Sequence, residues 1–411
     1  MKHYSNFLHL PKYGYYVAPG AVAHAVFPMV SLVFPTFNEA ASIEAALRRA
    51  AAALQATSEP YELIVVDDSS PDGTAEIAER LSNQLPVRVL RRGGRNGLAS
   101  AVVAGWKIAQ GNMLAVMDAD LQHPPEILGK LLAALQHSGA EIAIASRAAD
   151  GGGSKNWSPI RQFTSWIATH LAASVLPLTL SDVHDTMSGM FMLKASVLEG
   201  VSLEPKGYKI LLEVLAKGSY RNLVEVPYVF GPRDRGTSKL GARQTLEYFI
   251  HLAQLAVVTG QLKTWFCYAL VGFSGAFIHL AVLLFLVTNQ HWPLAFALLA
   301  AIQTALLNNF FWNRYFTFRR LPSVKSIAGA GLTLGFARYE TVCIPGALLN
   351  SLLTVVLLRF NFPLLSAASA GVVLGGVWNL FFNVPTIWRS AISKRASSQV
   401  ALPRVGDAKL F

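Results

Sequence analysis

Four long apolar stretches without Asp, Glu, Lys or Arg constrain the fold of this chain most. They cover residues 265–287, 292–311, 342–358 and 363–388. As helices they are long enough to cross a hydrocarbon layer of about 30 Å, the third only barely. A soluble helical bundle is the alternative, but 53% hydrophobic residues with only 14% charged residues is too apolar for an ordinary soluble enzyme. The sequence therefore predicts an all-α, four-helix transmembrane domain over residues 263–390.

The first two-thirds of the chain alternates short apolar runs with helical stretches. The runs that we interpret as strands are 29–34, 63–66, 87–90, 113–116 and 142–145. This alternation predicts an α/β domain with a doubly wound, mostly parallel sheet over residues 29–240. Around it we expect an N-terminal extension (1–28), an amphipathic interfacial helix (241–262) and a basic tail (391–411).

Charge and cysteine content narrow the partners and the compartment. The net charge of +11 favours an acidic partner, such as anionic lipid headgroups or nucleotide phosphates. Nucleic acid is disfavoured because no basic motif with interleaved aromatic residues occurs. Cys267 and Cys343 both lie in apolar runs, which excludes a disulfide framework or a cysteine metal site.

Basic residues also predict the orientation in the membrane. The connection between the second and third spans carries five of them, and the tail carries more, including Arg389, Lys394 and Arg395. The other two connections are short and contain almost none, with Arg359 as the exception. The sequence thus predicts an integral membrane protein. By the positive-inside rule, its α/β domain and both termini lie in the cytoplasm.

The segment 117–126, Met-Asp-Ala-Asp-Leu-Gln-His-Pro-Pro-Glu, is the first candidate site. It follows the run 113–116, so Asp118 and Asp120 should emerge at the carboxyl end of a buried strand, where ligands gather in open α/β sheets. Two carboxylates one residue apart suit a hard cation such as Mg²⁺ or Mn²⁺, and Gln122 could add a neutral oxygen. A helix cap before the Pro124-Pro125 pair is the plainer alternative.

Other strand ends also carry polar groups. The second strand runs into residues 67–74, where Asp67 and Asp68 could accept hydrogen bonds from a ribose or a base edge. A turn with helix caps is the alternative. The third strand leads into the basic loop 91–97, which suits a phosphate or is only a solvated turn.

Several blocks in the same order resemble the GT-A catalytic domain of glycosyltransferase family 2, in particular the polyprenol (dolichyl) phosphate mannosyltransferases. These blocks are 34–39, 67–74, 97–101, 117–126, 146–147, 185–189, 207–209 and 233–240. Residues 310–318 and 378–383 resemble paired segments of the GtrA-like four-helix membrane family, which suggests two related helix pairs.

The resemblance implies roles for individual residues. The donor nucleotide sugar would be held by Pro35, Phe37, Glu39, Val65, Asp67, Asp118, Ala119, Asp120, Lys209, Arg233 and Lys239. The metal would be bound by Asp118, Asp120 and Gln122, and catalysis would involve Asp118, Asp120, Arg233 and Asp185. Arg147, Arg161 and Ser165 are candidates for the acceptor phosphate; the last two lie four residues apart in a predicted helix and can reach one anion.

We therefore expect an inverting, metal-dependent glycosyltransferase that moves mannose from GDP-mannose to a polyprenyl phosphate, giving a lipid-linked sugar donor. No general base is needed, because a phosphate monoester is already anionic near neutral pH. A UDP-glucose or other UDP-hexose transferase is one alternative. A transporter or flippase of lipid-linked sugar with a regulatory soluble domain is another, and a homo-oligomer remains open.

Overall fold

The structure is a computed structural model that describes residues 16–17, 30–155, 157–180, 183–204, 209–232, 242–319 and 332–388. The chain divides into two compact units, each of which draws on two segments of the sequence. The first unit contains residues 1–158 and 187–251, and the second contains residues 159–186 and 252–411.

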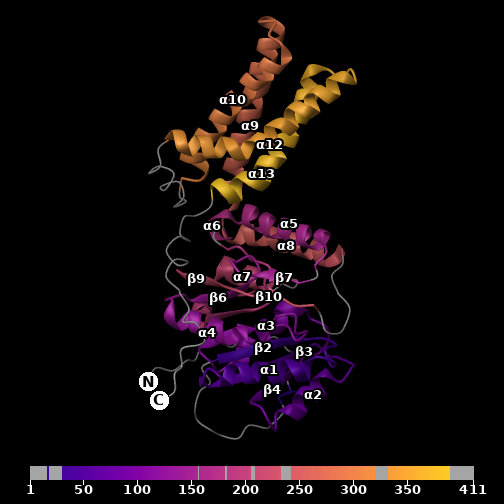
Figure 1. Ribbon diagram of the computed structural model, residues 1–411, viewed down its shortest axis with the longest axis vertical. Helices are drawn as coiled ribbons and strands as arrows, with labels where there is room; N and C mark the ends of the chain where they lie inside the picture. Colours follow the sequence, from indigo (N-terminus) through magenta and orange to yellow (C-terminus); the bar gives the residue numbers. More distant parts are fainter. Residues whose placement is uncertain are drawn as a thin grey trace. The chain divides into compact units, whose positions relative to one another are not determined.

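The first unit contains an eight-stranded sheet with the order β1-β4-β3-β2-β5-β8-β6-β9. Figure 1 labels five of its strands, β2, β3, β4, β6 and β9. β8 runs antiparallel to both of its neighbours, β1 pairs antiparallel with β4, and the other pairs are parallel. The strands are β1 (Tyr16–Val17), β2 (Val30–Thr36), β3 (Tyr61–Asp67), β4 (Val87–Arg91), β5 (Met113–Val116), β6 (Ile142–Ser146), β8 (Phe191–Lys194) and β9 (Leu223–Pro227). Two short strands, β7 (Gly153–Ser154) and β10 (Val229–Phe230), form a separate parallel pair.

Helices cover both faces of this sheet, because the central strand β2 is buried along its whole length and needs apolar cover on each side. The helices packed on its strands are α1 (Ile43–Gln55), α2 (Thr74–Leu81), α3 (Leu98–Ile108) and α4 (Ile127–His137). α7 (Ile210–Lys217) also belongs to this unit, and α8 (Ala242–Val258) crosses the boundary between the units. α3 lies very close to the sheet, since a Cβ atom on Gly105 would stand 2.6 Å from Val33 Cγ1.

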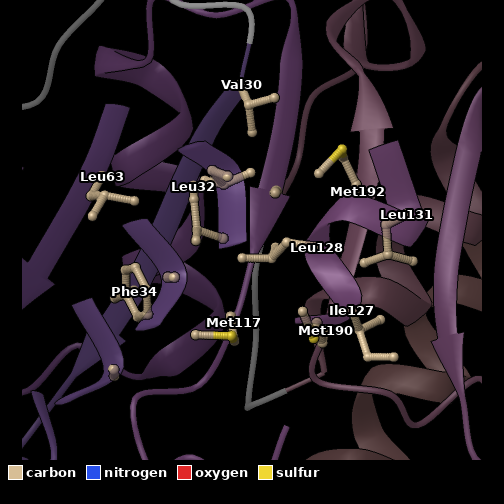
Figure 2. Packing of buried hydrophobic residues seen from close by; sticks show 14 of the residues in the cluster. Val30, Leu32, Phe34, Leu63, Met117, Ile127, Leu128, Leu131, Met190 and Met192 are labelled. Atoms are coloured by element: carbon tan, nitrogen blue, oxygen red, sulfur yellow. The ribbon is translucent and has the colours of Figure 1, made fainter. Parts of the chain in front are cut away.

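The main core lies between the sheet and helices α1, α2 and α4. Alternate residues of β2 point into it, and Figure 2 shows Val30, Leu32 and Phe34 packed in one cluster with Leu63 and Leu128. All five are fully buried. Truncating such a side chain as Phe34 to alanine costs about 3–5 kcal/mol, so this layer fixes the strands that carry the candidate site.

The predicted strands are confirmed in type and order, while two features were not predicted. β8 inserts antiparallel between β5 and β6, and β9 extends the sheet beyond β6. A four-residue strand such as β8 has too few residues for a periodic pattern to be recognised.

The second unit contains four helices long and apolar enough to cross a membrane, at Leu262–Asn289, Leu294–Thr317, Leu332–Arg359 and Leu364–Val384. This confirms the four predicted spans. The third is longer than expected: α12 (Leu332–Arg359) begins ten residues before the uncharged run and includes Arg338 and Glu340. Glu340 accepts a hydrogen bond from Gln303 at 2.5 Å, so a polar partner on a neighbouring helix satisfies it.

The other long helices of this unit are α9 (Leu262–Leu284), α10 (Leu294–Trp312) and α13 (Leu364–Ile387). The first two continue into π-helical turns, η2 (Phe285–Asn289) and η3 (Asn313–Thr317). Two helices from the middle of the sequence, α5 (Pro159–Val175) and α6 (Pro177–Leu180), also belong to this unit. α5 packs on α13, where the Trp166 and Phe382 ring centroids are 5.7 Å apart.

Candidate active site

The carboxyl ends of β2, β3 and β5 lie next to each other because these strands are parallel neighbours. Each strand therefore delivers its following loop to the same edge of the sheet. Three non-glycine residues in these loops, Asn38, Ser69 and Leu121, have φ values of 57°, 57° and 60°. This left-handed conformation is strained for a bulky residue such as Leu121, and such strain is often found at functional sites.

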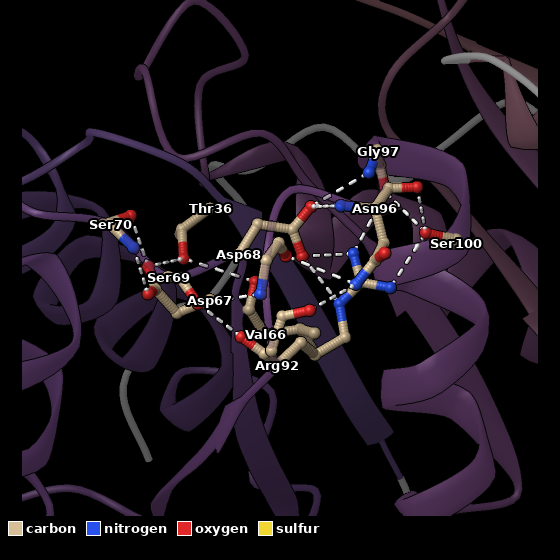
Figure 3. A network of polar contacts seen from close by, with 12 residues as sticks. Thr36, Val66, Asp67, Asp68, Ser69, Ser70, Arg92, Asn96, Gly97 and Ser100 are labelled. Atoms are coloured by element: carbon tan, nitrogen blue, oxygen red, sulfur yellow. Dashed lines mark hydrogen bonds and ion pairs between the residues drawn. The ribbon is translucent and has the colours of Figure 1, made fainter. Parts of the chain in front are cut away.

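Asp67, at the end of β3, is 2% exposed and holds its neighbours with both carboxylate oxygens. Oδ1 accepts hydrogen bonds from Thr36 Oγ1 at 3.0 Å and Ser70 Oγ at 2.6 Å, and Oδ2 accepts one from the Ser70 amide at 2.8 Å (Figure 3). Ser70 Oγ in turn accepts a bond from the Asn38 amide. Asp67 thus joins the loops that follow β2 and β3.

Both carboxylate oxygens of Asp68 also interact with other groups of the protein. It forms a buried ion pair with Arg92, whose Nε lies 2.6 Å from Asp68 Oδ1. The other oxygen accepts hydrogen bonds from the amides of Asn96 and Gly97, each at 3.0 Å (Figure 3). Asp68 therefore fixes the loop after β4 rather than presenting a carboxylate to a ligand.

Asp72 ties the first loop to the start of α2. Its Oδ2 accepts a hydrogen bond from the Ala40 amide at 3.0 Å, and Oδ1 accepts one from Thr74 Oγ1. Burial acts to raise the pKa of Asp72, but the hydrogen bonds from Thr74 and Ala40 outweigh it, so the pKa lies below its usual value. The carboxylate therefore stays ionised at neutral pH and connects Ala40 with the start of α2.

The basic loop 91–97 was predicted to suit a phosphate, and the structure gives two of its arginines other partners. Arg92 pairs with Asp68, while Arg91 contacts Glu76 and Glu79, each at 2.8 Å. Hydrogen bonds to Glu79 and Glu76 raise the pKa of Arg91 above its usual value, so it remains a cation. Arg95 differs: its guanidinium lies over the Phe37 ring, 4.5 Å from the centroid.

Asp118 and Asp120 follow β5 directly. Asp120 is buried, and its Oδ1 accepts a hydrogen bond from the Gln122 amide at 3.1 Å, whereas the Asp118 side chain is 30% exposed. Gln122 pairs with Gly231 through two contacts, the Gly231 amide to the Gln122 carbonyl at 2.8 Å and Gln122 Nε2 to the Gly231 carbonyl at 3.3 Å. The strand end is thereby tied to the residues just before segment 233–240.

Gly189 makes room for the Asp118 carboxylate. A Cβ atom at this glycine would stand 2.6 Å from Asp118 Oδ2 and 3.1 Å from His123 Cε1. His123 is buried, with Nδ1 4.0 Å from Asp118 Oδ2 and its ring stacked on Tyr228 at 5.4 Å. The missing side chain at Gly189 thus leaves a recess in which Asp118 stands, half-exposed, beside a fixed imidazole.

These residues fit a hard divalent cation. The donor set would be carboxylate oxygens from Asp118 and Asp120, with the Gln122 side-chain oxygen nearby, and Mg²⁺ takes oxygen ligands while sharing them with substrate phosphates. Among the described residues there is no group of three or more His, Cys, Asp or Glu side chains arranged to hold a metal. A site with two protein carboxylates matches a cation that is shared with a diphosphate rather than a closed structural site.

The other predicted residues fall in different places. Pro35, Phe37, Glu39, Val65 and Ala119 lie with the aspartates at the strand ends of the first unit. Lys209 is in this unit too, and its Nζ donates to the Met187 carbonyl at 2.7 Å. Arg147 also belongs to it: its guanidinium lies 5.1 Å from the Trp157 ring and 5.6 Å from the Phe230 ring. Phe230 contacts His123 edge-on at 5.1 Å, which links Arg147 to the aspartate pair.

Arg161, Ser165 and Asp185 belong to the second unit. Arg161 and Ser165 lie one turn apart on α5, as predicted; Arg161 is exposed and Ser165 half-buried. Asp185 is buried. Arg233 and Lys239 lie outside the described residues.

Three features of this site were not predicted from the sequence. The ion pair between Asp68 and Arg92 joins residues 24 apart, and no spacing rule predicts it. His123 stands between the Asp118-Ala119-Asp120 pair and two prolines, a position that could have identified it as a neighbour of the aspartates. Gly189 could have been marked as a position where a backbone must approach another group closely.

Comparison with known proteins gives the class of this fold and site. Residues 31–201 match the family model of glycosyl transferase family 2, and residues 267–388 match that of the GtrA/DPMS transmembrane domain. The protein is a glycosyltransferase with a membrane domain.

Its relatives define the family more closely. A dolichol-phosphate mannosyltransferase from Pyrococcus furiosus is 40% identical over 345 residues, which cover 84% of this chain and 95% of the relative. The chain belongs to the dolichol-phosphate mannosyltransferase family. The enzyme of that name from Saccharomyces cerevisiae is 37% identical over 55% of this chain and 86% of its own length. An undecaprenyl-phosphate mannosyltransferase from Micrococcus luteus is 34% identical over 51% of this chain and 87% of its own length.

Proposed function

We propose that this protein transfers mannose from GDP-mannose to a polyprenyl phosphate, with inversion at the anomeric carbon, and depends on Mg²⁺ or Mn²⁺. The observation that carries the proposal is the similarity to the Pyrococcus furiosus dolichol-phosphate mannosyltransferase, which extends through both the α/β and the membrane domain. The joined loops at the ends of β2 and β3 support it, because they form a fixed edge on which a nucleoside diphosphate can be held.

On the donor side, Pro35, Phe37, Glu39, Val65 and Asp67 bind the nucleoside. Asp118, Ala119 and Asp120 face the diphosphate, and a bound cation supplies charge that stabilises the departing nucleoside diphosphate. Gln122 donates a hydrogen bond to the Gly231 carbonyl, so the chain at Gly231 lies beside the strand end that carries Asp118 and Asp120. Arg233 and Lys239, from the segment 233–240, neutralise charge on the leaving group, and Lys209 adds to the donor site.

On the acceptor side, Arg161 and Ser165 hold the lipid phosphate, with Arg147 as a further cation and Asp185 facing the sugar. A phosphate monoester is anionic near neutral pH and attacks without a general base. The task of the protein is therefore to position the acceptor phosphate next to the donor nucleotide sugar, although both are anions.

The α/β domain and both termini face the cytoplasm, where nucleotide sugars are available. Protease accessibility in sealed vesicles of known orientation tests this orientation.

The transfer is tested by incubating the purified full chain with a polyprenyl phosphate and a panel of GDP- and UDP-sugars, and reading the lipid product by mass. We expect a hexosyl product from GDP-mannose that carries a β linkage by NMR. If a UDP-hexose is used in preference to GDP-mannose, the proposed donor is wrong. An α linkage in the product would contradict an inverting mechanism. Absence of any lipid product would favour the transporter alternative.

The acceptor site is tested by Arg161→Ala. Loss of a charge-assisted bond to phosphate costs about 1.5–3 kcal/mol, or roughly ten- to a hundredfold in acceptor-dependent rate. Donor affinity by calorimetry should stay unchanged, and Arg161→Lys should restore only part of the rate because it lacks the planar guanidinium. Gln162→Ala, at an exposed neighbour on another face of α5, is the control. A fall in donor affinity instead would assign Arg161 to the donor site.

A further inference from the structure

A partly open cavity of about 290 Å³ lies among the four long helices of the second unit. It is far larger than the space of about 30 Å³ that one water occupies. Its walls combine apolar side chains, such as Phe273, Ile302 and Leu306, with uncharged polar ones. No Asp, Glu, Lys or Arg lines it among the described residues.

The polar groups of this cavity occupy matching positions in two helix hairpins. α9 and α10 form the first hairpin, and α12 and α13 form the second. Tyr268, Gly275 and His279 on α9 have the same spacing as Tyr339, Gly346 and Asn350 on α12, and Asn309 and Asn313 match Asn379 and Asn383. All of these except Asn383 line the cavity. The sequence similarity between 310–318 and 378–383 is thus part of a repeat that extends through both hairpins.

Glycines bring the helices of each hairpin close together beside the cavity. A Cβ atom on Gly275 would stand 2.2 Å from Asn309 Oδ1, and one on Gly346 would stand 3.2 Å from Asn379 Oδ1. Small residues permit such close approach between membrane helices. The repeated Gly and Asn positions therefore place an asparagine from each hairpin at the cavity wall.

Three of these side chains have a buried polar atom without a hydrogen-bond partner among the described residues. They are His279, through Nε2, and Asn313 and Asn379, through Oδ1. His279 is 2% and Asn313 4% exposed. Buried polar groups normally find a hydrogen-bond partner, and polar residues inside a membrane usually mark a functional site.

We infer that this cavity binds a lipid alcohol, that is, an apolar chain ending in an uncharged hydroxyl group. The two amide oxygens without partners accept hydrogen bonds, so they need a donor, which a hydroxyl supplies and an ester or a phosphate anion does not. The absence of a cation in the described lining argues further against a phosphate. The apolar walls suit a hydrocarbon chain, because ligand sites combine mainly apolar surfaces with a few convergent polar groups.

Cys343 provides a probe, because its side chain lines the cavity while Cys267 lies outside the lining. In a Cys267→Ser protein reconstituted in phosphatidylcholine nanodiscs, the reaction of Cys343 with methyl methanethiosulfonate, which forms a mixed methyl disulfide and releases methanesulfinate, is followed by mass. Added polyprenol should slow the reaction about tenfold at ten times its Kd. Polyprenyl acetate, which has the same chain but no hydroxyl donor, should protect much less.

Two variants and one control sharpen the test. Asn379→Ala and Asn313→Ala, one on each hairpin, should each weaken protection about two- to tenfold, the effect of one neutral hydrogen bond. Thr304→Ala should not, because Thr304 is exposed, donates to Ala300 in its own helix and does not line the cavity. Retention of deuterated polyprenol, measured by native mass spectrometry, gives a second readout if Cys343 reacts too slowly in the ligand-free protein.

The lipids in the test distinguish the sources of the hydroxyl group. Protection by both polyprenol and diacylglycerol supports a site for lipid alcohols in general, and protection by polyprenol alone supports an isoprenoid site. Equal protection by the acetate overturns the inference that a hydroxyl is recognised. The absence of both protection and a retained lipid means that the cavity holds only water and overturns the proposal.

Discussion

Two pairs of aspartates stand at the same edge of the sheet and are used differently. Asp67 and Asp68 are 2% and 4% exposed and accept hydrogen bonds from at least five donor groups of the surrounding loops. Asp118 is 30% exposed, and the backbone facing it is a glycine. Their motifs look alike in the sequence, since each is a group of carboxylates after a buried strand.

The difference shows how a rigid edge and a reactive group are combined. The pair at β3 uses its charge to hold three loops. These loops are in place before the reaction, so no free energy is needed to reorganise them when the transition state forms. The pair at β5 keeps a carboxylate within reach of solvent. The comparison predicts that changes at Asp68 and its partner Arg92 act mainly on stability, and changes at Asp118 mainly on catalysis.

The largest effect is expected for Asp118→Ala. The departing diphosphate would lose several kcal/mol of charge stabilisation, so transfer should fall about a thousandfold or more while the fold is kept. The rate of lipid product formation and the melting temperature are measured together, with Asp150→Ala, at an exposed loop position, as the control. A near-normal rate, or full activity of the wild type in excess chelator, would contradict the metal assignment.

Arg92→Ala tests the other pair. It leaves the Asp68 carboxylate buried without its cation, which typically costs about 3–5 kcal/mol of folding free energy. Arg91→Ala is the matched control: its side chain is 39% exposed, and exposed pairs contribute about 0–1 kcal/mol each. Denaturant unfolding of the full chain in detergent measures both. Equal destabilisation by the two variants would show that burial of the pair is not what matters.

Gly189→Ala tests the recess at Asp118. The added methyl group would force the carboxylate to move, and a displacement of about 1 Å can cost roughly a hundredfold in rate. Gly93→Ala is the control, because nothing lies within 4 Å of its added Cβ atom. We expect a lower kcat with little change in melting temperature. If kcat is unchanged, the position of Asp118 is not critical.

The smallest effect is expected for Arg95→Ala, which removes the cation over Phe37. An exposed cation–π contact contributes about 0.5–1 kcal/mol, so the KM for the donor should rise roughly two- to fivefold with kcat unchanged. Arg95→Lys should keep part of the effect. A larger change in kcat than in KM would mean that Arg95 acts on the transition state rather than on donor binding.

Hydrophobic patterning predicted most of the fold because it reports burial directly. The strands 30–36, 61–67 and 113–116 and the four apolar helices were found in this way. Motifs predicted the positions of Asp67, Asp118 and Asp120 at strand ends. They did not separate a carboxylate used for structure from one that faces solvent, because that difference depends on partners such as Arg92 and Gly189. Nor did they predict that α5, which follows β7 in the chain, belongs with the membrane helices.

The placement of α5 has a consequence for the synthesis of this protein. Ser174 at the end of α5 bonds to Phe381 on α13, 207 residues later in the chain. At about 5–20 residues per second, roughly 10–40 s pass between translation of the two. During this time α5 presents Phe163 and Trp166 without the helix on which Trp166 packs. A growing chain must therefore shelter α5 in lipid or with a chaperone until its last span has been inserted.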